Sequence, residues 1–323
     1  MSILLYLTVV SYGEDEMSEI INKVKNSIKL VIHGKDSVID DVLCAILAKG
    51  HILLEDIPGV GKTTLVTALA KTLALDYKRI QFTPDVLPSD LSGFTMFDKS
   101  SGSFVFREGA VFTNLFLADE INRTSPKTQS ALLEVMEEQN VTVDGVTHRL
   151  PNPFFVIATQ NPIGASGTQK LPESQLDRFM IRLTMGYPDH DSAIDILKGD
   201  SHEIVSELKP CLEKNEILSL QEQVAAAQAT DSILNYIVQL TEVTRNNDMY
   251  SLGLSPRASI ALLKMAKARA YISDRNYVVP EDIKAVYFSV ANHRVVLSTK
   301  AKATGYSLEM ALAKSFESVK MPG

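Results

Sequence analysis

The chain has 323 residues, which is long for one ordinary domain and suggests about two. Its 32 Lys and Arg against 39 Asp and Glu give a formal net charge of −7, so it lacks the positive field expected of a dedicated duplex-DNA-binding protein. Apolar residues make up 45% and charged residues 22%, an ordinary globular composition that excludes a disordered, collagen-like or coiled-coil chain.

The chain begins with a short apolar stretch at residues 3–10, ILLYLTVV. It is too short to span a bilayer, no Lys or Arg precedes it, and no small-residue cleavage site follows, which disfavours a membrane anchor or a signal peptide. We therefore treat residues 1–16 as an N-terminal extension, either a short strand or sequence ahead of a translation start at Met17. Cys44 and Cys211 lie far apart and belong to no CxxC motif, which fits a reducing cytoplasm.

Two helices and then a series of short apolar strands are predicted in the first half of the chain. A helical stripe over 18–32 ends at His33-Gly34, and Asp36 can cap the next helix, over 37–49. Five continuous apolar runs follow, separated by helical stretches or long loops, which predicts an α/β fold with a parallel sheet covered on both faces. These runs are 52–54, 79–82, 115–118, 154–158 and 181–185.

After Pro188 the pattern changes to helices. We therefore expect a domain boundary near Pro188, with an α/β domain over 17–188 and a mostly α-helical domain over 189–323. The helical patterns of the second part are 191–198, 216–229, 232–246, 256–272, 280–291 and 308–319.

Residues 56–64, DIPGVGKTT, follow the first predicted strand and open a helix, which is the setting of a phosphate-binding loop. The glycines let the backbone N–H groups turn towards phosphate oxygens, the lysine reaches the β- and γ-phosphates, and the first threonine offers its hydroxyl to Mg²⁺. Asp56 stands where the motif usually has glycine, so we expect a departure in the first turn of the loop. The predicted ATP-binding residues are Pro58, Gly59, Val60, Gly61, Lys62, Thr63 and Thr64, with Thr63 also on the metal.

The strand at 115–118 ends in two acids, Asp119 and Glu120. At this distance after a phosphate loop, Asp119 is expected to manage Mg²⁺ and Glu120 to polarise the attacking water, although a solvated acidic pair at a strand end is the plainer alternative. The strand at 154–158 runs into Asn161, whose amide is suited to holding the water and the γ-phosphate. An Asn before Pro is also common in turns.

Two arginines complete the set of candidate residues. Arg178 lies in QLDRF, just before the fifth strand, and Arg257 lies in LSPRA, at the start of a helix in the second domain. A guanidinium suits phosphate charge, whereas a lone surface arginine more often forms an ordinary ion pair.

The motifs DIPGVGKTT, LFLADEINR, ATQNP, QLDRF and LSPRA occur in the order and spacing of AAA+ ATPases. The chain most resembles the MoxR family, in the helix-2-insert group that includes magnesium-chelatase ATPase subunits. This resemblance implies a five-stranded sheet of order 5-1-4-3-2 and a C-terminal helical lid. It implies that Asn161 is sensor 1, that Arg178 is the arginine finger for a neighbouring subunit's ATP, and that Arg257 is sensor 2.

The resemblance also places the adenine base near Val31, Ile32 and Gly34, positions that equally suit a buried helix end. Two segments resemble family inserts: a small hairpin within 84–107, and residues 141–148, which alternate around Asp144-Gly145 as in a type I′ hairpin. Inserts of this group line one face or the pore of the ring, while hairpins that only pack on the core are equally compatible with the sequence.

The function implied by the resemblance is that of an ATPase working as a ring, a hexamer in the family, that remodels or matures client proteins. Its partners would include proteins with von Willebrand factor A domains, and the chain itself has no DxSxS metal-ion-dependent adhesion motif. A nucleic-acid-linked or transcription-linked motor is the alternative, and the acidic charge weighs against it. A weak nucleotide switch is a third, against which the intact Lys62, Asp119 and Glu120 weigh.

Overall fold

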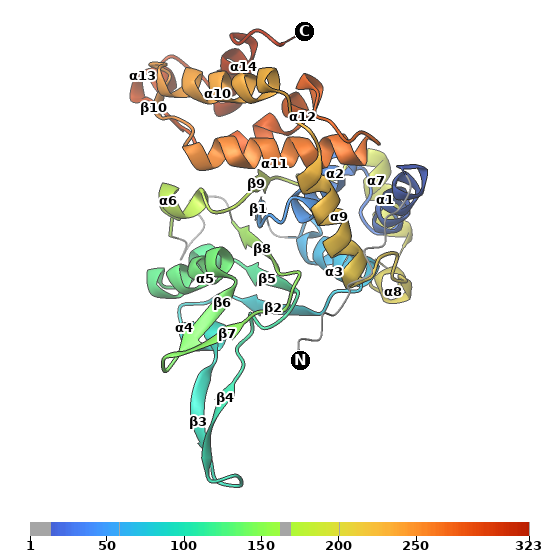
Figure 1. Cartoon of the computed structure of the whole chain (residues 1–323), viewed down its shortest axis with the longest axis vertical. Helices are drawn as coiled ribbons and strands as arrows, with labels where there is room; N and C mark the ends of the chain where they lie inside the picture. Colours follow the sequence, from blue (N-terminus) through green and yellow to red (C-terminus); the bar gives the residue numbers. More distant parts are fainter. Residues whose placement is uncertain (1–13, 58, 162–168, 200, 323) are drawn as a thin grey trace, which may run out of the picture.

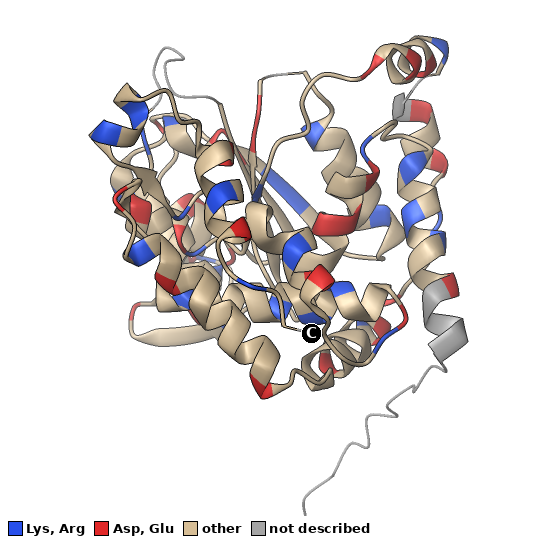
Figure 2. Ribbon diagram, turned by 90° about the horizontal axis from the view of Figure 1, so that it is seen from above, with Lys and Arg blue, Asp and Glu red and all other residues tan. Residues whose placement is uncertain are grey.

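The computed structural model describes residues 14–57, 59–161, 169–199 and 201–322, without the side chains of 14–18, 201 and 202. Most of the predicted N-terminal extension, and Pro58 in the phosphate loop, therefore lie outside the described residues. Within them, no helix has the length and apolar character needed to cross a membrane. Acidic and basic residues are interspersed along the helices rather than gathered by sign (Figure 2).

A five-stranded parallel sheet forms the centre of the molecule (Figure 1). Its order is β2-β5-β8-β1-β9. If these five strands are numbered one to five in chain order, the sheet order from the β9 edge is 5-1-4-3-2, as the resemblance implies. The labels in Figure 1 differ because they also count the strands of the hairpins. The strands are β1 (Ile52–Glu55), β2 (Tyr77–Gln81), β5 (Leu115–Asp119), β8 (Phe155–Gln160) and β9 (Ile181–Leu183).

Successive residues of the sheet strands enter two separate apolar clusters, because side chains alternate between the faces of a strand. Ile52 and Leu54 belong to the cluster beneath the first three helices, whereas Leu53 belongs to the cluster beneath α5. Burial on both faces explains the apolar runs of β1, β5 and β8, whereas the edge strand β2 carries polar residues and is largely exposed. The helices concerned are α1 (Glu14–Lys29), α2 (Asp36–Leu47), α3 (Lys62–Thr72) and α5 (Pro126–Glu138).

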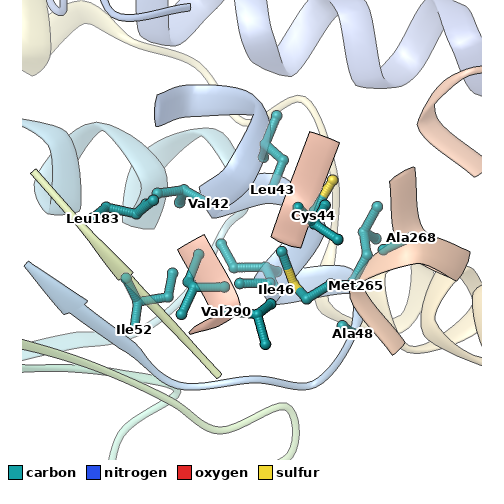
Figure 3. Packing of buried hydrophobic residues seen from close by; sticks show 14 of the residues in the cluster. Val42, Leu43, Cys44, Ile46, Ala48, Ile52, Leu183, Met265, Ala268 and Val290 are labelled. Atoms are coloured by element: carbon teal, nitrogen blue, oxygen red, sulfur yellow. The ribbon is translucent and has the colours of Figure 1, made fainter. Parts of the chain in front are cut away.

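The C-terminal helices pack on the β9 edge of the sheet and against α2 (Figure 1). Cys44 of α2, Met265 of α11 and Val290 of α12 lie in one apolar cluster with Leu183 of β9 (Figure 3). The two predicted domains therefore share a core, and the boundary near Pro188 stays a prediction. The elements after β9 are α7 (His190–Lys198), α8 (Ser201–Glu207), α9 (Lys214–Ala226), α10 (Asp231–Arg245), β10 (Tyr250–Leu252), α11 (Pro256–Ile272), α12 (Pro280–Ala291), β11 (Val296–Leu297), α13 (Thr299–Ala303) and α14 (Leu308–Glu317).

One predicted cap is wrong. The N-cap of α2 is Lys35, which makes no side-chain capping hydrogen bond, and Asp36 is already the first helical residue. The carboxylate of Asp36 instead accepts a hydrogen bond from Lys29 Nζ (2.8 Å). The short elements α8 and α13 and the β10–β11 pair were not predicted, since segments of this length hold too few turns or alternations for a periodic pattern.

Both predicted hairpins are present. The first, β3 (Phe94–Asp98) with β4 (Ser103–Arg107), follows the short helix α4 (Pro88–Ser92) and extends away from the body of the molecule (Figure 1). The second, β6 (Asn140–Val143) with β7 (Val146–Arg149), turns at Asp144 and Gly145, whose φ angles of 51° and 80° fit the predicted type I′ turn. The hairpins meet where the rings of Phe106 and His148 stack with centroids 3.8 Å apart.

Candidate nucleotide-binding site

The loop between β1 and α3 presents its backbone to a hollow. Gly59 and Gly61 have φ angles of 86° and 91°, in the left-handed region that favours glycine, and Gly61 is the N-cap of α3. Among the described residues other than its neighbours in the chain, none has an atom within 4 Å of the place where a Cβ of Gly59 would stand. An open loop at a helix N-terminus is suited to bind an anion.

Lys62, the first residue of α3, is held beneath this loop. Its side chain is buried, and Nζ donates a hydrogen bond to the carbonyl oxygen of Asp56 (2.8 Å). Burial lowers the pKa of Lys62, while the negative charges of Asp56, Asp119 and Glu120 act in the opposite direction. The ammonium group therefore lies close to the acid pair at the end of β5, as the motif order predicts.

Asp56 has a structural role at the position where the motif usually has glycine. Its Oδ2 accepts hydrogen bonds from the backbone N–H groups of Met185 (2.6 Å) and Gly186 (2.8 Å), and its Oδ1 accepts one from Ile57 N–H (3.0 Å). The carboxylate is 5% exposed. Asp56 therefore ties the start of the phosphate loop to the segment that leaves β9, which accounts for the departure in the first turn.

Asp119 lies at the carboxyl end of β5 with both carboxylate oxygens in contacts. Oδ1 accepts a hydrogen bond from Thr159 Oγ1 (2.6 Å), and Oδ2 lies 2.6 Å from Arg79 Nη2. The Arg79 side chain is 41% exposed, so the side of Asp119 that it covers is accessible to another cation if Arg79 moves. The carboxylate of Asp119 and the hydroxyl of Thr63, the two predicted metal ligands, are hard oxygen donors of the kind that Mg²⁺ prefers.

Glu120 is held in a defined orientation. Asn161 Nδ2 donates to Oε1 (2.9 Å) and Arg123 Nη1 to Oε2 (2.7 Å). Burial alone would raise the pKa of Glu120, but the hydrogen bonds from Arg123 and Asn161 outweigh it and hold the pKa below its usual value. Glu120 also has a left-handed backbone (φ 58°, ψ 47°), which is uncommon outside glycine and typical of functional sites. The structure thus brings Asn161 to the acid pair.

A cavity of about 640 Å³ adjoins the phosphate loop, a size typical of small-molecule sites. Val31 and Ile32, expected at the adenine base, line it, whereas Gly34 does not and its neighbours His33 and Lys35 do. Its lining combines apolar side chains with residues of the phosphate loop, which suits a base joined to phosphates. Its remaining lining residues are Gly59, Val60, Gly61, Thr64, Met185, Gly186, Pro188, Ile196 and Gly199.

Arg178 and Arg257 lie together, away from this cavity. Arg178 Nη1 is 3.3 Å from Glu137 Oε2, and Arg257 Nη2 is 2.5 Å from Glu137 Oε1. Glu137 belongs to α5, and Arg178 follows α6 (Glu173–Leu176). In Figure 1, α5 and α6 lie on the flank opposite to α1 and α7, the helices beside the cavity. We call Glu137, Arg178 and Arg257 the arginine flank.

Sequence profiles of two known families match the chain. Residues 51–181 match the ATPase family associated with various cellular activities (AAA), and residues 242–313 match the AAA lid domain. The sheet, the phosphate loop and the acid pair, taken with these matches, define an ATPase of the AAA+ class that binds and hydrolyses ATP.

The particular family follows from closer relatives. The chain is 47% identical over 315 residues to YeaC of Bacillus subtilis, covering 97% of this chain and 98% of that protein. It is 38% identical over 304 residues to the chaperone MoxR1 of Mycobacterium tuberculosis, covering 91% and 80%. A crystal structure of a protein from Cytophaga hutchinsonii has a TM-score of 0.87 and 38% identity, covering 96% and 97%. The chain belongs to the MoxR family of AAA+ ATPases.

Several residues of the site were not predicted from the sequence. Thr159 and Arg123 stand inside the motifs ATQNP and LFLADEINR, two or three residues from positions that were selected, so the local signal was present. Arg79 and Glu137 belong to other segments, and only the strand register and the fold of α5 reveal their partners.

Proposed function

We propose that the protein hydrolyses Mg²⁺-ATP within a ring of identical subunits and uses the cycle to remodel or mature client proteins. The catalytic elements are the phosphate loop at 58–64, the acid pair Asp119 and Glu120, Asn161, and the arginine flank. The chain would act in the reducing cytoplasm, in keeping with its two free cysteines, as a core over 17–188 with a lid over 189–323.

The observation that carries this proposal is the separation of the cavity from the arginine flank on opposite sides of one subunit (Figure 1). A subunit with two complementary but different surfaces associates head to tail, and such contacts close into a ring when the rotation allows it. In that arrangement, the Arg178 and Arg257 of one subunit face the nucleotide of the next. This favours the ring and the finger role together.

Within the pocket, Lys62 and the loop N–H groups hold the phosphates, and Glu120 accepts a proton from the attacking water. The pKa of Glu120, held below its usual value, keeps it ionised near neutral pH, and Asn161 fixes the oxygen that faces the reaction. Thr63 and Asp119 would hold Mg²⁺, which neutralises phosphate charge when bound. Arg178 of the neighbour stabilises the charge that develops in the transition state.

The client would be engaged by the first hairpin. Phe97 and Phe104 pair across β3 and β4 near its tip, and their side chains are 51% and 74% exposed. Exposed aromatic side chains at one place on a surface mark an interaction site. The name of the chaperone MoxR1 supports a client-protein role, and a von Willebrand factor A domain protein remains our proposed partner.

The experiment mixes two inactive variants. Arg178→Ala subunits keep an intact pocket, and Lys62→Ala subunits keep an intact finger, so mixed rings should recover ATPase activity that neither variant shows alone. As a control, mixing Lys62→Ala with Glu120→Gln subunits should recover nothing, because no pocket in those rings is complete. If the first mixture stays inactive while native mass spectrometry shows mixed rings, Arg178 does not act on a neighbour's ATP.

A further inference from the structure

The two arginines of the arginine flank share one carboxylate. Glu137 offers one oxygen to each, Oε2 to Arg178 and Oε1 to Arg257, at 3.3 and 2.5 Å. The three side chains and Met136 line a cavity of about 100 Å³. Two guanidinium groups that converge on one point repel each other unless an anion lies between them, and here that anion belongs to α5.

The backbone beneath the two arginines is fixed. Asp177, which precedes Arg178, accepts a hydrogen bond from Ser255 Oγ (2.9 Å), and Ser255 is the N-cap of the helix that carries Arg257. Asp177 also pairs with Arg294 (2.8 Å), whose side chain is 2% exposed. The positions of Arg178 and Arg257 are therefore set relative to each other. Arg178 Nη1 also donates a hydrogen bond to the carbonyl oxygen of Leu133 (2.7 Å), so the contacts that a ligand could replace are those with Glu137.

The contacts with Glu137 are of a kind that exchanges readily. The side chains of Arg178, Arg257 and Glu137 are 33%, 47% and 41% exposed, and exposed ion pairs contribute little stability. A phosphate group carries more negative charge than a carboxylate and matches the planar guanidinium with two oxygens. An incoming phosphate therefore competes well for both arginines.

We propose that Glu137 is the resident counter-ion of the arginine flank. In a free subunit it holds Arg178 and Arg257 together in the arrangement that receives the terminal phosphate of a nucleotide on the neighbouring copy. It gives them up when that phosphate arrives. The carboxylate thus occupies the place of a phosphate that another subunit supplies. Because the phosphate must displace it, Glu137 raises the concentration of nucleotide-bound subunits at which rings assemble. This inference rests on the proposed ring function.

The test measures assembly with a non-hydrolysable ATP analogue and Mg²⁺ by analytical ultracentrifugation over a range of protein concentrations. Because Glu137→Gln weakens the pair that must be broken, the concentration for half-assembly should fall about two- to fivefold. A purely structural role for Glu137 would raise this concentration instead. Glu137→Ala should lower the half-assembly concentration as Glu137→Gln does. This second variant excludes an effect of hydrogen bonds that the glutamine could still make.

Glu138→Gln is the matched control. It removes the same charge from the same exposed end of α5, next to Glu137, and should leave the half-assembly concentration unchanged. The gain from Glu137→Gln should also vanish in an Arg178→Ala, Arg257→Ala background, because Glu137 then has no guanidinium to release.

Two failures are distinguishable. If Glu137→Gln leaves the half-assembly concentration unchanged or raises it, while Arg178→Ala still abolishes turnover, Glu137 does not occupy the place of the phosphate and the proposed function stands. If Arg178→Ala subunits turn over ATP at the wild-type rate, the proposed trans site fails and the role of Glu137 fails with it.

Discussion

The phosphate loop and the arginine flank hold their charged groups in opposite ways. In the loop, Lys62 and Asp56 are 8% and 5% exposed and bind backbone atoms of their own subunit. In the flank, the side chains of Arg178, Arg257 and Glu137 are one third to one half exposed, and Glu137 pairs with both arginines, while Arg178 also donates a hydrogen bond to the carbonyl oxygen of Leu133. The loop is a preformed cradle, whereas the flank has side-chain ends that remain available.

We expect this difference to separate nucleotide binding from catalysis. The buried dipoles of the phosphate loop need little rearrangement when an anion enters, so the loop is suited to tight binding of the nucleotide. An exposed group of arginines suits a surface that meets its ligand only after assembly. Variants of the two regions should therefore change different steps of the cycle.

The largest effect is expected in the arginine flank. Arg178→Ala should lower the ATP turnover of assembled protein by about 10³- to 10⁵-fold, as for other arginine fingers, while each subunit keeps its affinity for ATP. Stopped-flow binding of a fluorescent ATP analogue and steady-state hydrolysis measure the two quantities. A large loss of affinity in isolated subunits would mean that Arg178 belongs to its own pocket and would remove the contrast between the two regions.

Two substitutions at the nucleotide-binding site should affect different steps, one the binding of ATP and the other its hydrolysis. Lys62→Ala would remove the ammonium group that we propose binds the β- and γ-phosphates, and should weaken ATP binding by about 10²- to 10⁴-fold. Glu120→Gln should bind ATP nearly as well as the wild type but hydrolyse it about 10²- to 10⁴-fold more slowly, since an amide is a poor base. Isothermal titration with ATP and a phosphate-release assay distinguish them. Unchanged hydrolysis by Glu120→Gln would exclude Glu120 as the base.

The smallest expected effect is that of low pH on the stability of the fold. Burial lowers the pKa of His51 to about 4, and its ring contacts the carbonyl oxygen of Met136, next to Glu137. Burial likewise lowers the pKa of His293, which contacts the carbonyl oxygen of Phe179, next to Arg178. Both histidines thus support the arginine flank in their neutral form.

Because the unfolded chain takes up protons on these histidines first, their contribution to the free energy of unfolding should fall as pH drops from 6.5 towards 4 and level off above neutral pH. His51 alone accounts for about 3 kcal/mol over this range. Asp41, whose pKa burial raises to about 6, offsets part of it, since its folded form is protonated first. Urea unfolding at a series of pH values measures the slope. Hydrogen exchange that rises first around α3 rather than α5 would contradict the assignment to the arginine flank.

The parts of the molecule that were predicted from the sequence are those encoded by neighbouring residues. The strands β1, β5 and β8 contain unbroken apolar runs, the phosphate loop is one contiguous motif, and Asp119 and Glu120 stand at the end of β5. Each of these signals is complete within a few residues, so no knowledge of the tertiary fold was needed to recognise it.

The parts that were not predicted depend on residues far apart in the chain. Arg79 meets Asp119 only because β2 and β5 pair in one register. Asp56 binds Met185 and Gly186, 129 and 130 residues further along the chain, only because β1 and β9 are neighbours in the sheet. Glu137 meets Arg178 and Arg257 only after α5, the turn that follows α6, and α11 have packed together. A carboxylate on a helix surface has no pattern of its own, so the sequence treats it as an ordinary solvated charge.

The apolar core shared by α2, α11, α12 and β9 has a mechanical consequence (Figure 3). Arg294 adds to it, since its guanidinium is buried and binds the carbonyl oxygens of Phe179 and Met180 as well as Asp177. Swinging the C-terminal helices away from the sheet would expose this core and leave a buried cation without partners, which is costly. We therefore expect each subunit to move as one rigid unit, so that in the proposed ring the motion that follows hydrolysis would occur at the contacts between subunits.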